Sequence, residues 1–200
     1  MTDSYIRDYL KESRQIIDAL DIPKIQKIID FIAEIRSQGG RLFFIGVGGG
    51  AGNASHAVND FRKIAGLESY APFDNVSELT AQINDHGWEN ALVYWLTTSR
   101  LKSTDGVFVF SVGGGDKEKN ISVNIINALD YAKKVGAKII GIVGRDGGYA
   151  GRIGDAIVVI PPINPLTITP QTESFQSLVW HLIVADPQIQ LNPMKWESVK

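Results

Sequence analysis

The chain has 200 residues, of which 44% are hydrophobic and none is cysteine, so it can bury one sizeable core but can form no disulfide or thiolate site. Its 20 Lys and Arg residues are scattered and balanced by 22 Asp and Glu residues, which argues against a nucleic-acid partner and favours a small-molecule one. With neither a signal peptide nor an apolar run of about 18 residues, we expect a soluble, cytoplasmic protein with no membrane contact.

Two amphipathic helices are predicted before any strand. In residues 5–20 and 22–40, apolar side chains recur at three- and four-residue spacings, and Gly39 and Gly40 end the second pattern. The apolar stripe of the second helix, which includes Ile25, Ile28 and Ile29, exceeds what one small sheet needs for cover. We therefore expect residues 1–38 to form a helical oligomerisation segment.

Four short runs rich in β-branched and aromatic residues follow, namely RLFFIGV, GVFVFSV, AKIIGIVG and DAIVVIPP. They are too short and too uniformly apolar for half-exposed strands, so they predict buried parallel strands, and SYAPF suggests a further short one. Helices are expected over residues 53–65, 123–135 and 172–184, the last with Thr169 as N-cap before Pro170. This order predicts a doubly wound α/β core over residues 39–200, within a single domain of residues 1–200.

Two glycine-rich turns follow predicted strands. GVGGGAG begins at Gly46 and SVGGGDKEKN begins at Ser111. Ligands of such folds bind beyond the carboxyl ends of the strands, where glycine allows a close approach to the backbone and a helix N-terminus favours an anion. These turns therefore predict a ligand that carries phosphate.

The first turn also fits a dinucleotide-binding alternative. Gly46, Gly48 and Ala51 have the fingerprint spacing, and Asp74 lies near the place of the ribose-binding acid. That pattern alone is weak. A second glycine-rich turn after another strand fits a split phosphosugar site better.

Several segments, in order, resemble sugar isomerase (SIS) domain proteins of the phosphoheptose isomerase type. They are GVGGGAGNASHAVND, NDHGW, FSVGGG with NISVNIINAL, GIVGRDGG and TPQTESFQSLVWHLIV, and the resemblance covers nearly the whole chain. It implies a three-layer α/β/α fold with a five-stranded parallel sheet and a homotetramer with active sites at subunit interfaces. The implied reaction converts sedoheptulose 7-phosphate to a heptose phosphate.

The resemblance also implies two substrate-binding regions. Where the family turn has Asn and Ser, this chain has Val47 and Gly50, and the family phosphate loop is lengthened here by an insert, GGGDKEKN. Lys117 and Lys119 of the insert either supply charge in place of missing hydroxyls or belong to a solvated loop. The expected substrate-binding residues are Gly48, Gly49, Gly50, Asn53, Asp85, Ser111, Gly113, Gly114, Lys117, Lys119 and Ser122.

The residues expected to act on the sugar lie on two helices. Isomerisation needs a base for the proton beside the carbonyl and an acid or metal to stabilise the enediolate. By resemblance, Asp60 matches the catalytic Glu and His181 the catalytic His. His56, Asp60, Glu173 and His181 match positions that bind zinc in some members, with Glu173 as fourth ligand or as the base. The alternative for each polar residue is a satisfied core group.

Two functions follow from these patterns. The first is a ketose–aldose isomerase acting on a sedoheptulose 7-phosphate-like substrate. The second is a non-catalytic SIS module that binds a sugar phosphate or a protein partner as a tetrameric sensor or scaffold. The substitutions at Val47, Gly50 and Asp60 favour the second function, whereas the presence of both His56 and His181 favours the first.

Overall fold

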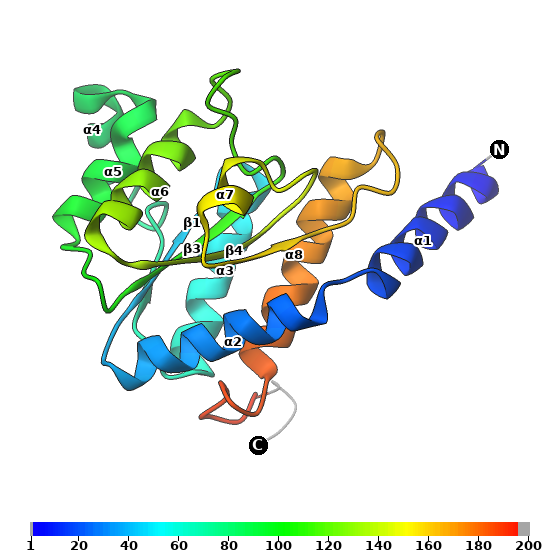
Figure 1. The fold of residues 1–200 in the computed structure, drawn as a ribbon, viewed down its shortest axis with the longest axis horizontal. Helices are drawn as coiled ribbons and strands as arrows, with labels where there is room; N and C mark the ends of the chain where they lie inside the picture. Colours follow the sequence, from blue (N-terminus) through cyan, green and yellow to red (C-terminus); the bar gives the residue numbers. More distant parts are fainter. Residues whose placement is uncertain (1, 196–200) are drawn as a thin grey trace.

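The computed structural model describes residues 2–195 and contains a five-stranded, wholly parallel sheet between layers of helices (Figure 1). The helices are α1 (Thr2–Asp18), α2 (Ile22–Ser37), α3 (Gly49–Lys63), α4 (Val76–His86), α5 (Trp88–Thr98), α6 (Val123–Val135), α7 (Gly148–Ile153) and α8 (Ile168–Ala185). The strands are β1 (Leu42–Ile45), β2 (Ser69–Tyr70), β3 (Gly106–Ser111), β4 (Lys138–Val143) and β5 (Ala156–Val159). The predicted fold class is confirmed, including the short strand in SYAPF.

The strand order β2-β1-β3-β4-β5 places the ligand-binding edge of the sheet. After β1 the chain returns on one side as β2 and then crosses to the other side as β3, so the order reverses between β1 and β3. In parallel sheets this reversal opens a crevice beyond the strand ends. The two glycine-rich turns follow β1 and β3, so both lie at this crevice.

Alternate residues of each strand face two separate cores. In β1, Phe44 packs with the helices α2, α3 and α8, whereas Phe43 and Ile45 pack with α5 and α6. Figure 1 shows the same two groups of helices on opposite sides of the sheet. Because both faces are covered, the strands are apolar at every position, which is the pattern that the sequence showed.

The second helix has a different role from the predicted one. Ile25, Ile28, Ile29 and Ile32 are all at most 5% exposed because α2 lies on the sheet as a core helix. The interpretation of these side chains as surplus for oligomerisation is wrong. Within the N-terminal segment, most of the exposed apolar side chains belong to α1, which projects from the body of the molecule (Figure 1), and Ile22 at the start of α2 is also exposed.

Two helices begin earlier than predicted. α3 starts at Gly49 rather than at residue 53, and α8 starts at Ile168 rather than at residue 172. Thr169 is therefore not the N-cap of α8; that position is Thr167, and Pro170 lies within the first turn, where its missing N–H has no cost. Helix α6 has the predicted bounds. None of the helices between residues 2 and 195 is long and apolar enough to cross a bilayer.

Candidate active site

The turn between β1 and α3 brings open backbone to the crevice. Gly48 has a φ of 60° and precedes α3 without any side-chain cap. The N–H of Gly50 donates to the Val47 carbonyl oxygen at 3.0 Å, whereas those of Gly48 and Gly49 have no partner among residues 2–195. Gly46 is required for tightness, because a Cβ there would lie 2.4 Å from the carbonyl oxygen of Gly50. The side chain of Val47 is 43% exposed beside these groups. The N–H groups of Gly48 and Gly49 are therefore available to an oxygen-rich ligand, whereas that of Gly50, also predicted to bind substrate, is used within the turn.

The second turn is clamped against the loop that follows β4. A Cβ on Gly114 would lie 2.0 Å from the Gly147 carbonyl oxygen, and one on Gly148 would lie 2.0 Å from that of Gly113. Ser111, which is buried, accepts a hydrogen bond from the N–H of Gly114 through its hydroxyl at 3.0 Å. Ser111 and Gly114 thus shape the turn, while the N–H of Gly113 has no partner among residues 2–195.

An open cavity of about 1220 Å³ lies over this second turn. Its walls come from the second turn and its insert, the loop after β4, the helix α7, the start of α8 and Val47 of the first turn. Ser122 lines it from the N-terminus of α6, and its hydroxyl makes no cap hydrogen bond. The cavity is large enough for a sugar phosphate.

Both lysines of the insert have partners within the chain. Lys117 lies 2.7 Å from Asp130 of α6 and 4.2 Å from the ring centre of Tyr149, which also donates a hydrogen bond to Asp130. The pKa of Lys117 is raised because its ammonium donates to Asp130 and contacts Tyr149. Burial raises the pKa of Asp130, but the hydrogen bonds from Lys117 and Tyr149 outweigh it and hold this pKa below its ordinary value. Lys119 pairs with Asp116 at 3.5 Å.

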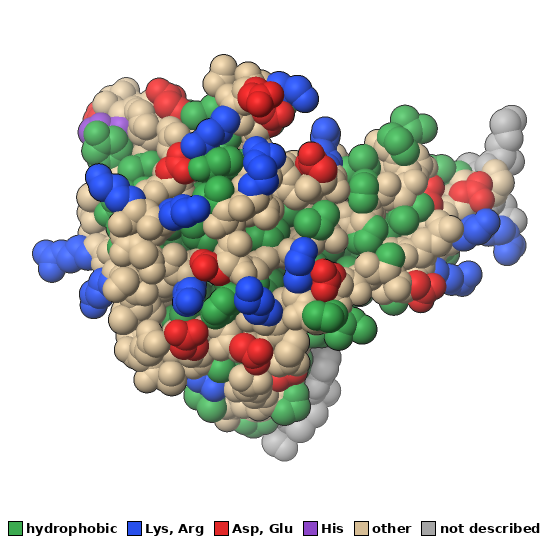
Figure 2. Space-filling model, viewed as in Figure 1, with side chains coloured by type: hydrophobic (Ala, Val, Ile, Leu, Met, Phe, Trp, Pro, Cys, Tyr) green, Lys and Arg blue, Asp and Glu red, His purple; other side chains and the backbone are tan. Residues whose placement is uncertain are grey.

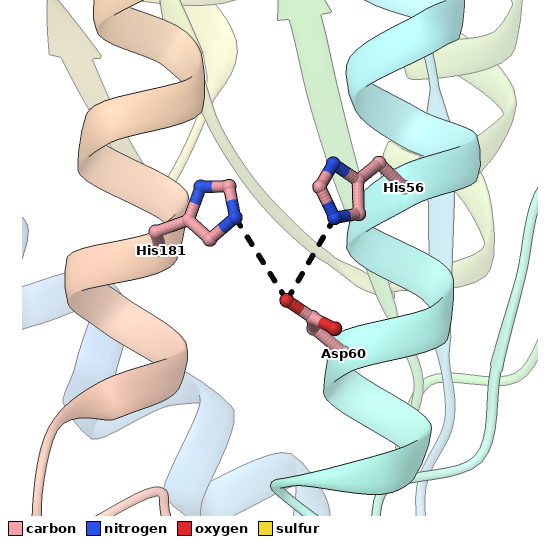
Figure 3. A group of neighbouring side chains, drawn as sticks. All are labelled: His56, Asp60 and His181. Carbon is pink, nitrogen blue, oxygen red and sulfur yellow. Dashed lines mark ion pairs between the residues drawn. The ribbon is translucent and has the colours of Figure 1, made fainter. Parts of the chain in front are cut away.

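Three of the predicted ligating side chains converge between α3 and α8 (Figure 3). The Nε2 atoms of His56 and His181 lie 4.0 and 3.8 Å from Oδ2 of Asp60. Candidate ligand atoms of all three residues lie within 4.8 Å of one another. His56 and Asp60 share one helix face because they are four residues apart, whereas His181 arrives from the facing helix.

Hydrogen bonds behind the cluster fix its orientation. Nδ1 of His181 lies 2.7 Å from the carbonyl oxygen of Ser177, so Nε2 is the nitrogen that faces Asp60. The ring of Trp180 stacks on His181 at 3.5 Å and donates from its Nε1 to Asn53 at 3.2 Å. Such backbone and ring contacts hold an imidazole ready for a metal or a proton.

Asn53, predicted to bind substrate, links α3 to α8 instead. Its amide nitrogen donates to the Glu173 carbonyl oxygen and to the side chain of Gln176, and its oxygen accepts from Trp180. Gln176 is fully buried and continues this network to the carbonyl oxygen of Ile142 in β4. The amide of Asn53 is therefore occupied in positioning the helix that carries His181 and Glu173.

Glu173 lies apart from the three clustered ligands. Its carboxylate lies at the start of α3, 2.3–2.6 Å from the point that a Cβ on Gly49 would occupy. It is two helical turns from His181, a separation of about 12 Å along the axis. Glu173 thus lies beside the first glycine-rich turn and outside the cluster of His56, Asp60 and His181.

Asp85 is the predicted residue that the structure does not bring to the site. It lies exposed at the end of α4 and accepts a hydrogen bond from Asn84 at 2.9 Å. Conversely, the cavity contains two arginines and an aromatic ring that were not predicted, namely Arg145, Arg152 and Tyr149. The signal that could have identified them was GIVGRDGG, a third glycine-rich turn directly after a buried strand.

A profile of the SIS domain matches residues 5–144. The chain belongs to the SIS domain family. Among curated relatives of this SIS protein, the phosphoheptose isomerase of Geotalea daltonii is 31% identical over 144 residues, which cover 70% of this chain and 71% of the relative. The phosphoheptose isomerase of Aneurinibacillus thermoaerophilus is 26% identical, covering 99% of this chain and 100% of that one. The lincomycin biosynthesis protein LmbN of Streptomyces lincolnensis is 28% identical over 90% of this chain and 67% of the relative.

Solved structures show the same SIS fold. The phosphoheptose isomerase of Francisella tularensis superposes with a TM-score of 0.79 at 21% identity, covering 92% of this chain and 96% of that chain. The corresponding protein GmhA of Neisseria gonorrhoeae gives a TM-score of 0.77, also at 21% identity and with the same coverage.

Proposed function

We propose that this SIS protein is an aldose–ketose isomerase of a sugar phosphate of about seven carbons, resembling sedoheptulose 7-phosphate. The observation that carries the proposal is the convergence of His56, Asp60 and His181 from two helices. A non-catalytic module has no need for two imidazoles and a carboxylate directed at one point. The relatives named phosphoheptose isomerase over nearly the full chain support the same reaction class.

We assign proton transfer to Glu173, and binding of the sugar oxygens and of the phosphate to the two glycine-rich turns. Glu173, beside the first glycine turn, takes the proton from the carbon next to the carbonyl and returns it to the neighbouring carbon. N–H groups at the start of α3 hold the sugar oxygens, and the cavity over the second turn receives the phosphate. In this proposal the reacting carbons lie between the two glycine turns and His181.

The cluster on α3 and α8 fits a zinc ion. Two imidazoles and a carboxylate are typical of catalytic zinc sites with an open position, and the Nδ1 contact of His181 to the Ser177 carbonyl is the usual support for such a ligand. His56, Asp60 and His181 would hold the ion. When bound, zinc would polarise the sugar carbonyl as a Lewis acid. We propose Glu173 as the base rather than as the fourth ligand.

Elemental analysis tests the zinc assignment. Protein purified without chelator or affinity nickel should contain close to one zinc per chain, and His56→Ala should lose it. His86→Ala is the matched control, since His86 stacks on Tyr94 at 3.5 Å, away from the cluster. If wild type lacks metal and added zinc changes neither thermal stability nor turnover, Asp60 and His181 act alone as an acid/base pair.

Proton exchange tests the reaction itself. Wild type incubated in D₂O with a panel of ketose phosphates should incorporate deuterium at C1 with at least one of them, measured by NMR. His181→Ala should abolish the exchange and leave the fold intact, because the ring is 43% exposed and its loss opens no deep cavity. His86→Ala should keep it. No exchange by wild type with any sugar of the panel would favour the non-catalytic module.

A homotetramer is part of the proposal. Helix α1 leaves Tyr5, Ile6, Leu10 and Ile17 more than half exposed, and no residue of α4 is buried within the chain. Helices of this kind need a neighbouring surface to cover them. Assembly of copies would also bring exposed polar residues such as Asp85 to the site of a neighbour.

A further inference from the structure

The SIS resemblance associates phosphate binding with hydroxyl groups that the insert GGGDKEKN of the second turn lacks. Another group must therefore supply the charge that holds a phosphate there. The insert lysines do not supply it. Lys117 forms an ion pair with Asp130 and lies over the ring of Tyr149. Lys119 forms an ion pair with Asp116, which belongs to the same insert. Both ammonium groups thus already have a carboxylate partner within the chain, whereas a cation without a partner would have its whole charge available to a phosphate.

Arg145 has the properties that the lysines lack. It directly follows Gly144 at the carboxyl end of β4 and lines the cavity. Its side chain lies along the second turn, with Cδ 3.6 Å and Nε 3.9 Å from the point where a Cβ on Gly113 would be. Among residues 2–195, its guanidinium makes neither a hydrogen bond nor an ion pair.

The backbone at Arg145 is held in a costly conformation. Its φ is 53°, a left-handed value that is unfavourable for a residue with a Cβ. The same loop elsewhere uses glycine, because Gly147 and Gly148 also have positive φ. Arg100 has the same φ, so what distinguishes Arg145 is its unpartnered head group in the wall of the cavity.

The groups around Arg145 suit a dianionic phosphate. The Ser122 hydroxyl and the Gly113 N–H lie in the same cavity wall without partners among the described residues, and the N-terminus of α6 opens there. Three carboxylates also line the cavity, and one of them, Asp116, accepts hydrogen bonds from the N–H groups of Glu118 and Lys119. Asp146 accepts from the Gly148 N–H at 3.1 Å, whereas Glu118 is exposed on the insert.

We propose that Arg145 is the cation that binds the substrate phosphate in this chain, with Ser122 and the backbone of the second turn completing the grip. The inference rests on the proposed function for the identity of the substrate, but the phosphate site itself can be tested without turnover. The guanidinium would bind two phosphate oxygens at once, which a lysine cannot do. Arg145 is thus a binding residue, not an acid or base.

Titration with inorganic phosphate, followed by calorimetry, tests the site. Arg145→Gln should raise the dissociation constant roughly 10- to 100-fold, as expected for a lost charged hydrogen bond. Arg145→Lys should recover only part of the affinity. Arg100→Gln is the matched control, because Arg100 is also exposed with a φ of 53° but lies before β3, at the opposite edge of the sheet. It should bind phosphate as wild type does.

Turnover separates this inference from the proposed function. With an active sugar phosphate, Arg145→Gln should raise KM by a similar factor and change kcat less. If wild type turns over no sugar phosphate while Arg145→Gln still loses inorganic phosphate, the isomerase proposal fails and the phosphate site stands. If Arg145→Gln binds phosphate normally and the double variant Lys117→Ala, Lys119→Ala does not, the insert holds the phosphate and the inference is overturned.

Discussion

The carboxylate of Glu173 lies beside the first glycine-rich turn, and it can lie there because residue 49 is a glycine without a Cβ. Gly49 lies in the first turn of α3, where any Cβ would overlap Glu173. Gly52, one turn further, has open space around its Cα. The two glycines therefore have different reasons to be present in the same helix, and they provide a paired test of the role of Glu173.

Gly49→Ala should lower kcat by roughly 10- to 100-fold, because a catalytic group displaced by about 1 Å loses its alignment. Stability should change little, since the flexible Glu173 side chain can move aside. Gly52→Ala should leave kcat within about twofold and stabilise the fold by about 0.5–1 kcal/mol, as alanine favours helix. Steady-state kinetics and thermal melts of both variants measure these effects on kcat and on stability. Equal kcat values for Gly49→Ala and Gly52→Ala would contradict the role of Glu173 in the reaction.

At the level of elements, the cavity depends on the contact between two loops. The first turn of α7 donates two backbone hydrogen bonds to the second glycine-rich turn, from Tyr149 N–H to the Gly115 carbonyl and from Ala150 N–H to the Gly114 carbonyl. Glycines on both sides allow this approach. The glycine run in the second turn is thus explained first by packing against α7, and among its glycines Gly113 and Gly115 have N–H groups without a partner in residues 2–195.

Gly114→Ala should destabilise the protein by about 2–4 kcal/mol, because the added Cβ meets the Gly147 carbonyl and the residue must also keep a φ of 69°. Gly39→Ala provides the control. Gly39 has a φ of 67° but nothing within 4 Å of its Cβ position, so only the conformational cost of about 1–2 kcal/mol applies. Equal losses in urea denaturation would show that the two loops separate at little cost.

Across the whole molecule, α1 is attached by a polar contact that should respond to pH. Glu12 accepts hydrogen bonds from Asn164 at 2.6 Å and Thr167 at 2.7 Å, and these bonds hold its pKa below the ordinary value of 4.5. A lowered folded-state pKa stabilises the fold above pH 4.5, and this stabilisation is lost as pH falls through the folded-state pKa. The melting temperature of wild type should exceed that of Glu12→Gln at pH 7, and the difference should vanish in acid. A pH-independent difference would contradict this role of the Glu12 charge.

The assembly prediction concerns the exposed side of α1. Figure 2 shows hydrophobic side chains exposed around the base of the projecting α1, and on this face Lys and Arg residues alternate with Asp and Glu. Wild type should sediment as a tetramer. The double variant Ile6→Glu, Leu10→Glu should sediment as smaller species, because it places charge on two side chains that are 55% and 53% exposed. Lys11→Glu, at an exposed neighbouring position, should remain tetrameric; a monomeric wild type would contradict the prediction.

Sequence periodicity determined the strands and the helices α1, α2, α3, α6 and α8, because helices and buried strands leave local patterns of spacing and polarity, whereas α4, α5 and α7 were not predicted. It also placed His56 and Asp60 on one helix face, since four residues make one turn. Only the tertiary structure decided how distant elements share their partners. It brought His181 to the face of α3 that carries His56 and Asp60, and it left Glu173 outside the cluster. It also paired Lys117 of the insert with the carboxylate of Asp130 in α6. These contacts depend on how the elements pack against one another, because several side chains could pair with the same neighbour. His181 and Asp60, for example, come from segments more than a hundred residues apart in the sequence.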